Sequence, residues 1–322
     1  MANITVAILG STGYARGIGK AGTTSDITFY NIKRGEDAVT MIEPARYPER
    51  VQSLFFSVSM ADEAILVVDE IDTAFGETVV MLHAVGVRKG YLILRNYLDP
   101  SRIAPLIRGT VVEGYRLVED DPVALREYLL QDVAAVTRDS KPETGGIVPI
   151  DHHFNVKGIG IVILGSVRSG IIHKHDIVAV LPGKKTAQIR SIQKHDDDWS
   201  TASAGDRVGL ALKNIGAEDL DRGFVLSTDG SVATTRTIHG RAELGSFWQH
   251  PLREGMVLHI GHWMQFVSGR VVTVDAGDDW KHPAVTIALD RDLVYLPGDS
   301  AVIHHLDAGR LRVAGSVLLH QP

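Results

Sequence analysis

A glycine-rich loop near the start of the chain is the first segment whose residue types suit ligand binding. The residues AILGSTGYARGIGKAG, positions 7 to 22, place an apolar strand directly before a run rich in glycine. Successive backbone N–H groups in such a loop can form a concave anion site, and glycine lets the backbone approach the ligand closely. If the loop holds an anion such as a phosphate, we expect Gly10, Gly13, Arg16 and Lys20 to contact it.

Two known kinds of nucleotide-binding loop agree with part of this segment. TGYARGIG (12–19) matches the T-G-x-x-x-G-x-G turn of short-chain dehydrogenases, and a P-loop frame that starts at Gly10 ends in A-R-G instead of G-K-[ST]. The first needs a helix facing the pyrophosphate, yet GTTSD (22–26) follows almost at once, and no tyrosine has a lysine four residues later. The second lacks both the lysine and the magnesium-binding hydroxyl. A glycine-rich turn without a ligand is the third interpretation.

The elements that would position this loop are those of an α/β domain. Apolar strands (ITVAIL, AVTMI, AILVVD and GYLILR) alternate with helix-like segments at 77–85 and 122–136, which predicts a parallel sheet flanked by helices. After the polar linker TRDSKPETGG, short alternating strands separated by turn residues predict β-barrels, with a second break near 227–235. We therefore expect an α/β domain over residues 1–140, a β-barrel over 146–230 and a second β-barrel over 231–322.

Composition excludes several classes of site. The 322 residues include no cysteine, so the chain has no disulfide, cysteine nucleophile or thiolate metal site, and no histidine cluster has the spacing of a metal site. The longest apolar runs are only strand-length, so we expect a cytoplasmic protein without a membrane partner. The net charge is −6, but residues 157–195 hold seven lysines and arginines against one acid, Asp176.

A long segment of the β-rich part carries a family resemblance. Residues 149–226, from PIDHHFNVKGIGIVILGSVRSGIIHKHD to AGDRVGLALKNIGAEDLDRGFVL, resemble domain 2 of the EF-Tu class of translation factors. Within that class, GTTSDITFYN (22–31), ARYP (45–48), IDHHFNV (150–156) and IRSIQKHD (189–196) resemble SelB and its archaeal relative EF-Pyl. The resemblance covers nearly the whole chain. It implies an EF-Tu-like three-domain architecture, in which a G-domain-like α/β domain precedes two β-barrels.

The resemblance also shows how far the GTPase motifs depart from their pattern. The D-x-P-G-H segment falls at residues 43–47, where Glu43 could accept a metal-bound water but Arg46 and Tyr47 replace the glycine and the histidine. The guanine motif N-K-x-D falls at Asn96 to Asp99, or one residue earlier without its carboxylate. Phosphoryl transfer depends on several such groups, and one group can change the rate by about 10³ to 10⁵. We therefore expect GTP hydrolysis to be lost and assign no cofactor. GTP with Mg²⁺ stays open, with Gly10, Gly13, Arg16, Asn96 and Asp99 as the nucleotide-binding residues.

In SelB-like factors the groove of domain 2 takes the amino-acid-bearing 3′ end of tRNA with an Asp-His or Asp-Arg pair and a later arginine. The matching positions are Asp151, His152 and Arg190, and the planar fork of an arginine suits a carboxylate or a phosphate. Gln193 stands where general elongation factors carry a glutamate beside the terminal adenosine. The alternative is a strand-edge pair and a solvated arginine. The full aminoacyl- or RNA-binding set that we predict is Asp151, His152, Lys184, Arg190, Gln193 and Lys194.

These observations predict an archaeal protein similar to a translation elongation factor, which binds aminoacyl-tRNA or other RNA, acts with the ribosome and does not hydrolyse GTP. One alternative is an active GTPase that delivers a specialised aminoacyl-tRNA. The other is a protein-binding scaffold that uses no RNA. The sequence indicates neither which tRNA is bound nor an oligomeric state.

Overall fold

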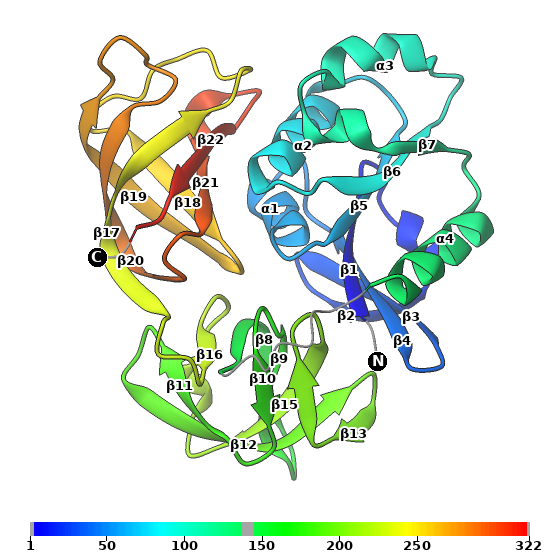
Figure 1. Ribbon diagram of the computed structural model, residues 1–322, viewed down its shortest axis with the longest axis vertical. Helices are drawn as coiled ribbons and strands as arrows, with labels where there is room; N and C mark the ends of the chain where they lie inside the picture. Colours follow the sequence, from blue (N-terminus) through cyan, green and yellow to red (C-terminus); the bar gives the residue numbers. More distant parts are fainter. Residues whose placement is uncertain (1–2, 137–144, 321–322) are drawn as a thin grey trace.

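The computed structural model describes residues 3–136 and 145–320, and it has three parts in chain order (Figure 1). An α/β domain comes first, a β-barrel drawn in green follows, and a second barrel, yellow to red, closes the chain beside the α/β domain. This is the architecture that the sequence predicted. Most of the expected linker, residues 137–144, lies outside the described residues.

The sheet of the first domain is mixed, with strand order β2-β3-β4-β1-β5-β6-β7. The prediction of a parallel sheet is right for the five strands from β4 to β7, and wrong for the edge, where β2, β3 and β4 pair antiparallel. Only Gly35 and Glu36 separate β3 from β4, and a two-residue connection can join only antiparallel strands. The strands are β1 (Asn3–Leu9), β2 (Lys20–Thr24), β3 (Ile27–Arg34), β4 (Asp37–Pro44), β5 (Glu63–Val68), β6 (Lys89–Leu94) and β7 (Arg116–Val118).

Four α-helices cover this sheet, of which the sequence predicted α2 and α4. Asp72 caps the start of α2 by accepting a hydrogen bond from the Phe75 backbone N–H at 2.8 Å, and Gly86 ends the helix with φ 86°. Helix α1 was missed because nearly all of its residues are buried, so it lacks the one-sided apolar pattern of a surface helix. The helices are α1 (Val51–Ser59), α2 (Thr73–Val85), α3 (Pro100–Ile107) and α4 (Pro122–Ala134), with 3₁₀ turns η1 (Tyr14–Gly17) and η2 (Val111–Gly114).

The middle barrel is a ring of six strands in the order β11-β16-β8-β9-β15-β12, closed by pairing of β11 with β12. Strand β13 pairs with β12 outside the ring, and β10 pairs with β14 in a small ribbon. The strands are β8 (Ile147–Val156), β9 (Gly160–Ser166), β10 (Ile171–His173), β11 (Ile177–Leu181), β12 (Lys185–Lys194), β13 (Asp197–Trp199), β14 (Thr201–Ser203), β15 (Arg207–Lys213) and β16 (Val225–Ser227), with 3₁₀ turn η3 (Ala217–Asp219).

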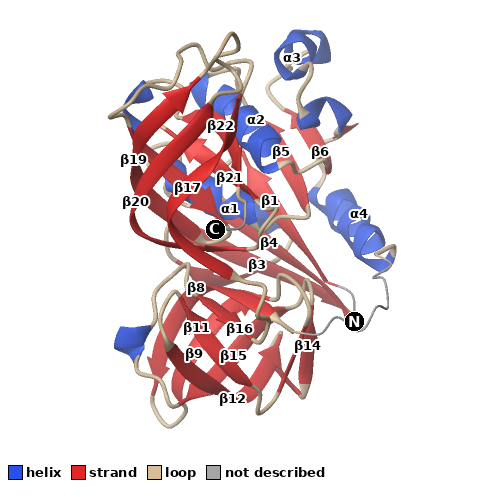
Figure 2. Cartoon of the chain, turned by 60° about the vertical axis from the view of Figure 1, so that its left-hand side comes forward, coloured by secondary structure: helices blue, strands red, loops and turns tan. Residues whose placement is uncertain are grey.

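The last barrel is closed in the order β17-β20-β19-β18-β21-β22. It shares a core with the α/β domain, because Phe55 and Phe56 of α1 lie in one buried apolar cluster with Met264 and Phe266. Figure 2 shows α1 and α2 between the sheet and this barrel. The strands are β17 (Ala233–Leu244), β18 (Val257–His262), β19 (Gln265–Asp275), β20 (Ala284–Tyr295), β21 (Ser300–His304) and β22 (Val313–Leu318), with 3₁₀ turn η4 (Leu306–Ala308).

None of the helices within residues 3–136 and 145–320 combines the length and the apolarity that a membrane-spanning helix needs.

Candidate functional site

The glycine-rich loop follows β1 but leads into a strand, not a helix. Gly10 and Gly13 have φ angles of 90° and 80°, a region that favours glycine. A Cβ on Gly10 would lie 1.9 Å from the carbonyl oxygen of Val67, so this position packs directly on the end of β5. The four-residue turn η1 and then β2 follow, so the loop has no helix N-terminus of the kind that faces phosphate in nucleotide-binding folds.

The carboxylate of Glu43 fills the centre of this loop. Its two oxygens accept the backbone N–H groups of Gly13 at 3.1 Å and Ala15 at 2.9 Å, and the hydroxyl of Tyr30 at 3.2 Å. Glu43 is buried, and it comes from the end of β4, the next strand in the sheet. The sequence suggested that Glu43 could accept a metal-bound water. In the structure both of its carboxylate oxygens instead accept hydrogen bonds from groups of the chain.

A small cavity of about 230 Å³ lies beside this loop, at the carboxyl ends of β1, β4 and β5. Four carboxylates line it, and its lining holds no lysine or arginine from the described residues. Arg16, expected to contact a phosphate, is exposed and outside the lining. Arg95 pairs with one of the four carboxylates, that of Asp69, at 3.1 Å, and the other carboxylates still outnumber the cations near the cavity, which disfavours a polyphosphate there. The four acidic residues are Glu43, Asp69, Glu70 and Asp72.

The two residues predicted to contact guanine form hydrogen bonds with backbone groups of their own domain. Asn96 donates from Nδ2 to the carbonyl oxygen of Asp69 at 3.0 Å. Asp99 is exposed and caps α3 by accepting the Ser101 backbone N–H at 2.8 Å. Hydrogen bonding to Ser101 lowers the pKa of Asp99 below its ordinary value. A role of Asn96 and Asp99 in nucleotide binding stays a prediction.

In the middle barrel, Asp151 and His152 lie against the α/β domain. Arg207 donates two hydrogen bonds to the Asp151 carboxylate, at 2.5 and 2.9 Å, and Nδ1 of His152 lies 2.7 Å from the same carboxylate. Burial is the largest influence on the pKa of Asp151 and would raise it, but the charges and hydrogen bonds of Arg207 and His152 together hold that pKa below its ordinary value. Nε2 of His152 lies 2.9 Å from Oγ of Ser25 in the first domain, so the predicted Asp-His pair is part of a domain interface.

A second arginine completes this interface. Arg222 donates from Nη1 to both carboxylate oxygens of Asp26, at 2.6 and 2.8 Å, and from Nε to the Asp151 carbonyl oxygen at 2.9 Å. Burial would raise the pKa of Asp26, and the hydrogen bond and charge of Arg222 lower it instead. Together, Asp151, His152 and Arg222 dock the barrel on the turn between β2 and β3.

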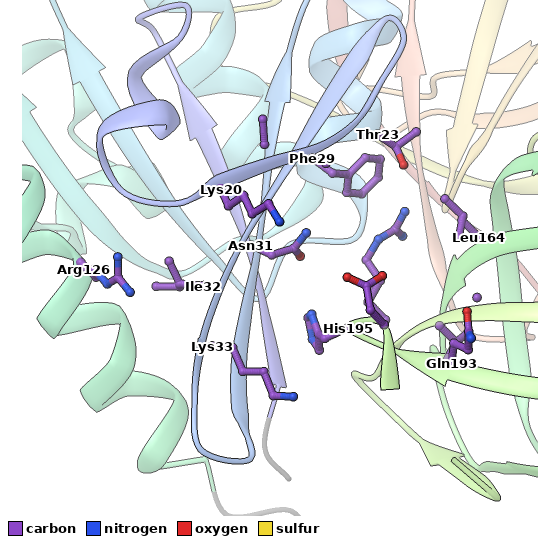
Figure 3. A pocket seen from close by; sticks show the side chains of 16 residues that line it. Lys20, Thr23, Phe29, Asn31, Ile32, Lys33, Arg126, Leu164, Gln193 and His195 are labelled. Carbon is purple, nitrogen blue, oxygen red and sulfur yellow. The ribbon is translucent and has the colours of Figure 1, made fainter. Parts of the chain in front are cut away.

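A cleft of about 520 Å³ opens next to this interface, between the β2–β3 hairpin and the barrel (Figure 3). Lys20, Asn31 and Lys33 come from the hairpin, and Gln193 and His195 from the barrel side. Its charged lining residues are Lys20, Lys33, Arg126, Arg207 and a single acid, Asp196.

The charges of this cleft are partly free. Lys33 pairs with Asp197 at 2.6 Å and Arg207 pairs with Asp151. Lys20 and Arg126 have no ion-pair partner in the described part of the chain. Burial, and then the charges of Lys33 and Arg207, lower the pKa of His195, whose Nε2 is buried without a partner in the described structure. The cleft therefore holds two cations without an ion-pair partner among the described residues, Lys20 and Arg126, which suits a phosphate-bearing ligand.

The structure brings only some of the predicted RNA-binding residues to the cleft. Gln193 lines the cleft, and Asp151 lies behind Arg207 and orients it. Arg190 is exposed and donates to the carbonyl oxygen of Ile159 at 3.1 Å, outside the lining of the cleft. Lys194 is buried, 3.0 Å from Asp206 and above the ring of Trp199. Lys184 is exposed beside the β11–β12 turn, also outside that lining. Their roles in RNA binding stay predictions.

Sequence analysis assigned no role to three cations that line the cleft, Lys33, Arg126 and Arg207. Arg207 stands within AGDRVG, a segment used for the family resemblance, but its side chain was not assigned a role. Lys33 comes from the β2–β3 hairpin, which the strand pattern did not predict. Lys20 was expected to hold an anion together with the glycine loop, and the structure places it in the lining of the cleft instead.

Comparisons with known sequences agree with this architecture. Residues 160–227 match the family Elongation factor Tu domain 2. An uncharacterized protein of Methanocaldococcus jannaschii is 35% identical over 319 residues, which cover 97% of this chain and 100% of that protein. The selenocysteine-specific elongation factor of the same organism is 23% identical over 92% of this chain and 71% of its own length. Elongation factor 1-alpha of Cenarchaeum symbiosum is 26% identical over 64% of this chain, which matches 56% of that factor.

Solved structures show the same fold. Translation elongation factor SelB of Methanococcus maripaludis, in complex with the GTP analogue GppNHp, superposes with a TM-score of 0.84 at 20% identity and covers 99% of this chain and 79% of its own. A bacterial selenocysteine-specific elongation factor, EF-Sec, gives a TM-score of 0.80 at 18% identity, over 99% of this chain and 58% of its own.

Proposed function

Because this chain belongs to the EF-Tu class of translation elongation factors, as a SelB-like member, we propose that it binds the 3′ end of an aminoacyl-tRNA or another RNA in the cleft between its first two domains, without hydrolysing GTP.

The observation that carries the proposal is the charge of the cleft. Lys20, Lys33, Arg126 and Arg207 line it with one acid, Asp196, although the whole chain has a net charge of −6. Lys33 and Arg207 are paired with Asp197 and Asp151, so the positive charge that a ligand would meet comes mainly from Lys20 and Arg126. A local concentration of cations in an acidic protein attracts the phosphates of a nucleic acid to one place. The cleft has a volume of about 520 Å³ and lies at a domain boundary, and a positively charged groove of this kind can follow the backbone of a single strand.

The loss of GTP hydrolysis is proposed from the loop and the acidic cavity. Glu43 takes the backbone donors that would bind phosphate, and the cavity offers carboxylates where phosphoryl transfer requires cations. Among the relatives, the SelB of M. maripaludis has been solved in complex with a GTP analogue. For the present chain, we propose that the G-domain-like part supports the cleft and does not turn over nucleotide.

Filter binding with charged and uncharged tRNA over a salt series tests the RNA-binding proposal. We expect binding that weakens steeply with salt, and tighter binding of charged tRNA if the aminoacyl group enters the cleft. Binding that is absent at low salt would contradict the proposal and favour the protein-binding scaffold.

Calorimetric titration with GTP and GDP in the presence of Mg²⁺ tests the second part, together with a phosphate-release assay. We expect no binding tighter than millimolar and no turnover. Sustained release of phosphate would favour the alternative of an active translational GTPase.

A further inference from the structure

The loop after β1 binds a carboxylate of its own chain in the place where loops of this type bind an external anion. Gly13 and Ala15 donate backbone N–H groups to Glu43, and Tyr30 adds a hydroxyl. All three groups are hydrogen-bond donors. An ionised carboxylate suits them because both of its oxygens accept hydrogen bonds. The loop is therefore satisfied without a ligand.

The backbone of β4, its pairing with β3 and a few hydrogen bonds connect Glu43 to the middle barrel. Glu43 lies opposite Thr28 in the β3–β4 register, and two residues further along the chain the backbone N–H of Ala45 donates to the carbonyl oxygen of Asp26 at 2.8 Å. The hydroxyl of Ser53 in α1 donates to the same oxygen at 2.6 Å. The Asp26 carboxylate then accepts Arg222 of the barrel.

We propose that Glu43 is an internal substitute for a bound phosphate, which closes the loop after β1 and, through the end of β4 and Asp26, keeps the middle barrel docked on the α/β domain with no nucleotide present. This inference concerns the domain arrangement and does not depend on RNA binding. In the proposed arrangement, a nucleotide does not change the positions of the domains, because the chain itself supplies the anion that holds the loop.

Distance measurements between two spin labels test this directly. The chain has no cysteine, so Arg102→Cys in α3 and Lys184→Cys in the barrel, both at exposed positions, would carry the only labels. We expect one narrow distribution of the distance between the two labels. It should not change on addition of GTP or GDP at about 1 mM, the upper end of typical physiological substrate levels. A shift with either nucleotide would overturn the inference.

Glu43→Gln then tests the carboxylate itself, because one acceptor oxygen becomes a donor that faces other donors. We expect a broader distance distribution and a melting temperature lower by about 5 °C. The matched control is Glu70→Gln, which removes the same charge from the same cavity at an exposed position, and it should change neither. Equal behaviour of the two variants would overturn the inference.

A third variant covers the case in which Glu43→Gln does not fold. Asp26→Asn weakens the other end of the connection and leaves the loop intact, so we expect the same broadening of the distance distribution. An unchanged distribution in Asp26→Asn would overturn the proposed connection. Loss of tRNA binding with unchanged distances would instead contradict only the proposed function.

Discussion

Glu77 and Arg312 lie 235 positions apart in the sequence, and their side chains form an ion pair between α2 and the last barrel. Arg312 donates to Glu77 from its backbone N–H at 2.7 Å, from Nε at 3.0 Å and from Nη2 at 2.5 Å. Nη2 also reaches the carbonyl oxygen of Pro48 at 2.9 Å. Because Glu77 is only 2% exposed, this pair connects two domains through a carboxylate that has almost no access to water.

Arg312→Ala should therefore be strongly destabilising. It leaves the buried carboxylate of Glu77 without its charged partner, and breaking such a pair costs about 3 to 5 kcal/mol. Urea unfolding measures the change. The matched control is Arg236→Ala, which removes an arginine from an exposed pair with Asp292 and should cost less than about 1 kcal/mol. A similar cost for both variants would show that burial of Glu77 does not matter.

Gly10→Ala should prevent the loop after β1 from packing on β5. The new Cβ would lie 1.9 Å from the Val67 carbonyl oxygen, and the residue keeps a φ of 90°. We expect a loss of about 3 kcal/mol or more in the free energy of unfolding. Gly35→Ala is the control, since Gly35 also has a positive φ but open space around it, and it should cost only about 1 to 2 kcal/mol.

Lys20→Ala should weaken RNA binding and lower the slope of log affinity against log salt by about 1, because one phosphate contact is lost. Lys184→Ala, the comparison, removes a lysine that the sequence predicted to bind RNA but that lies outside the cleft. From the position of the cleft we expect a smaller effect for Lys184→Ala, measured by filter binding over the same salt series. The reverse order would place the RNA on the outer surface of the barrel.

His304 should make stability depend on pH. Its ring is buried against Phe55 and Phe266, and burial lowers its pKa from 6.5 to about 3. The hydrogen bond to the His259 carbonyl oxygen opposes this shift, and the charges of His259 and Arg312 add to it. Between these two values the unfolded chain binds a proton that the folded chain does not. Stability from this group is therefore fully present above pH 6.5 and is lost as the pH falls, by about 1.4 kcal/mol per pH unit.

The measurement compares the wild type with His304→Asn, which retains a donor for the His259 carbonyl oxygen but does not titrate. The difference in unfolding free energy between the two proteins should decrease as the pH falls from 6.5 toward 4. Other buried histidines, such as His262, contribute equally to both proteins. A difference that is independent of pH would contradict the prediction.

The three-part fold and the family were predictable because they rest on long patterns, such as the strand and helix alternation and the match over residues 149–226. The site was less predictable, since its side chains meet only through tertiary contacts. Asp151 looked like a ligand-binding acid, yet it neutralises Arg207 of β15, which lies on the far side of β9 from Asp151. Glu43 looked like an acceptor for a metal-bound water, and no local pattern indicated that its carboxylate accepts the backbone N–H groups of Gly13 and Ala15. Such pairings depend on strand order, which local patterns do not specify.

The short turn η1 and strand β2 occupy the stretch where a nucleotide-binding domain would build its first helix. Strand β2 is the outer strand of the sheet and carries Lys20 into the cleft. The same stretch of about ten residues therefore cannot form both a helix that faces a phosphate and the strand that lines the cleft. A helix there would remove a wall of the cleft, and the wall leaves no room for the helix. These residues can form either a phosphate-binding helix or one side of the cleft, and in this chain they form the side of the cleft.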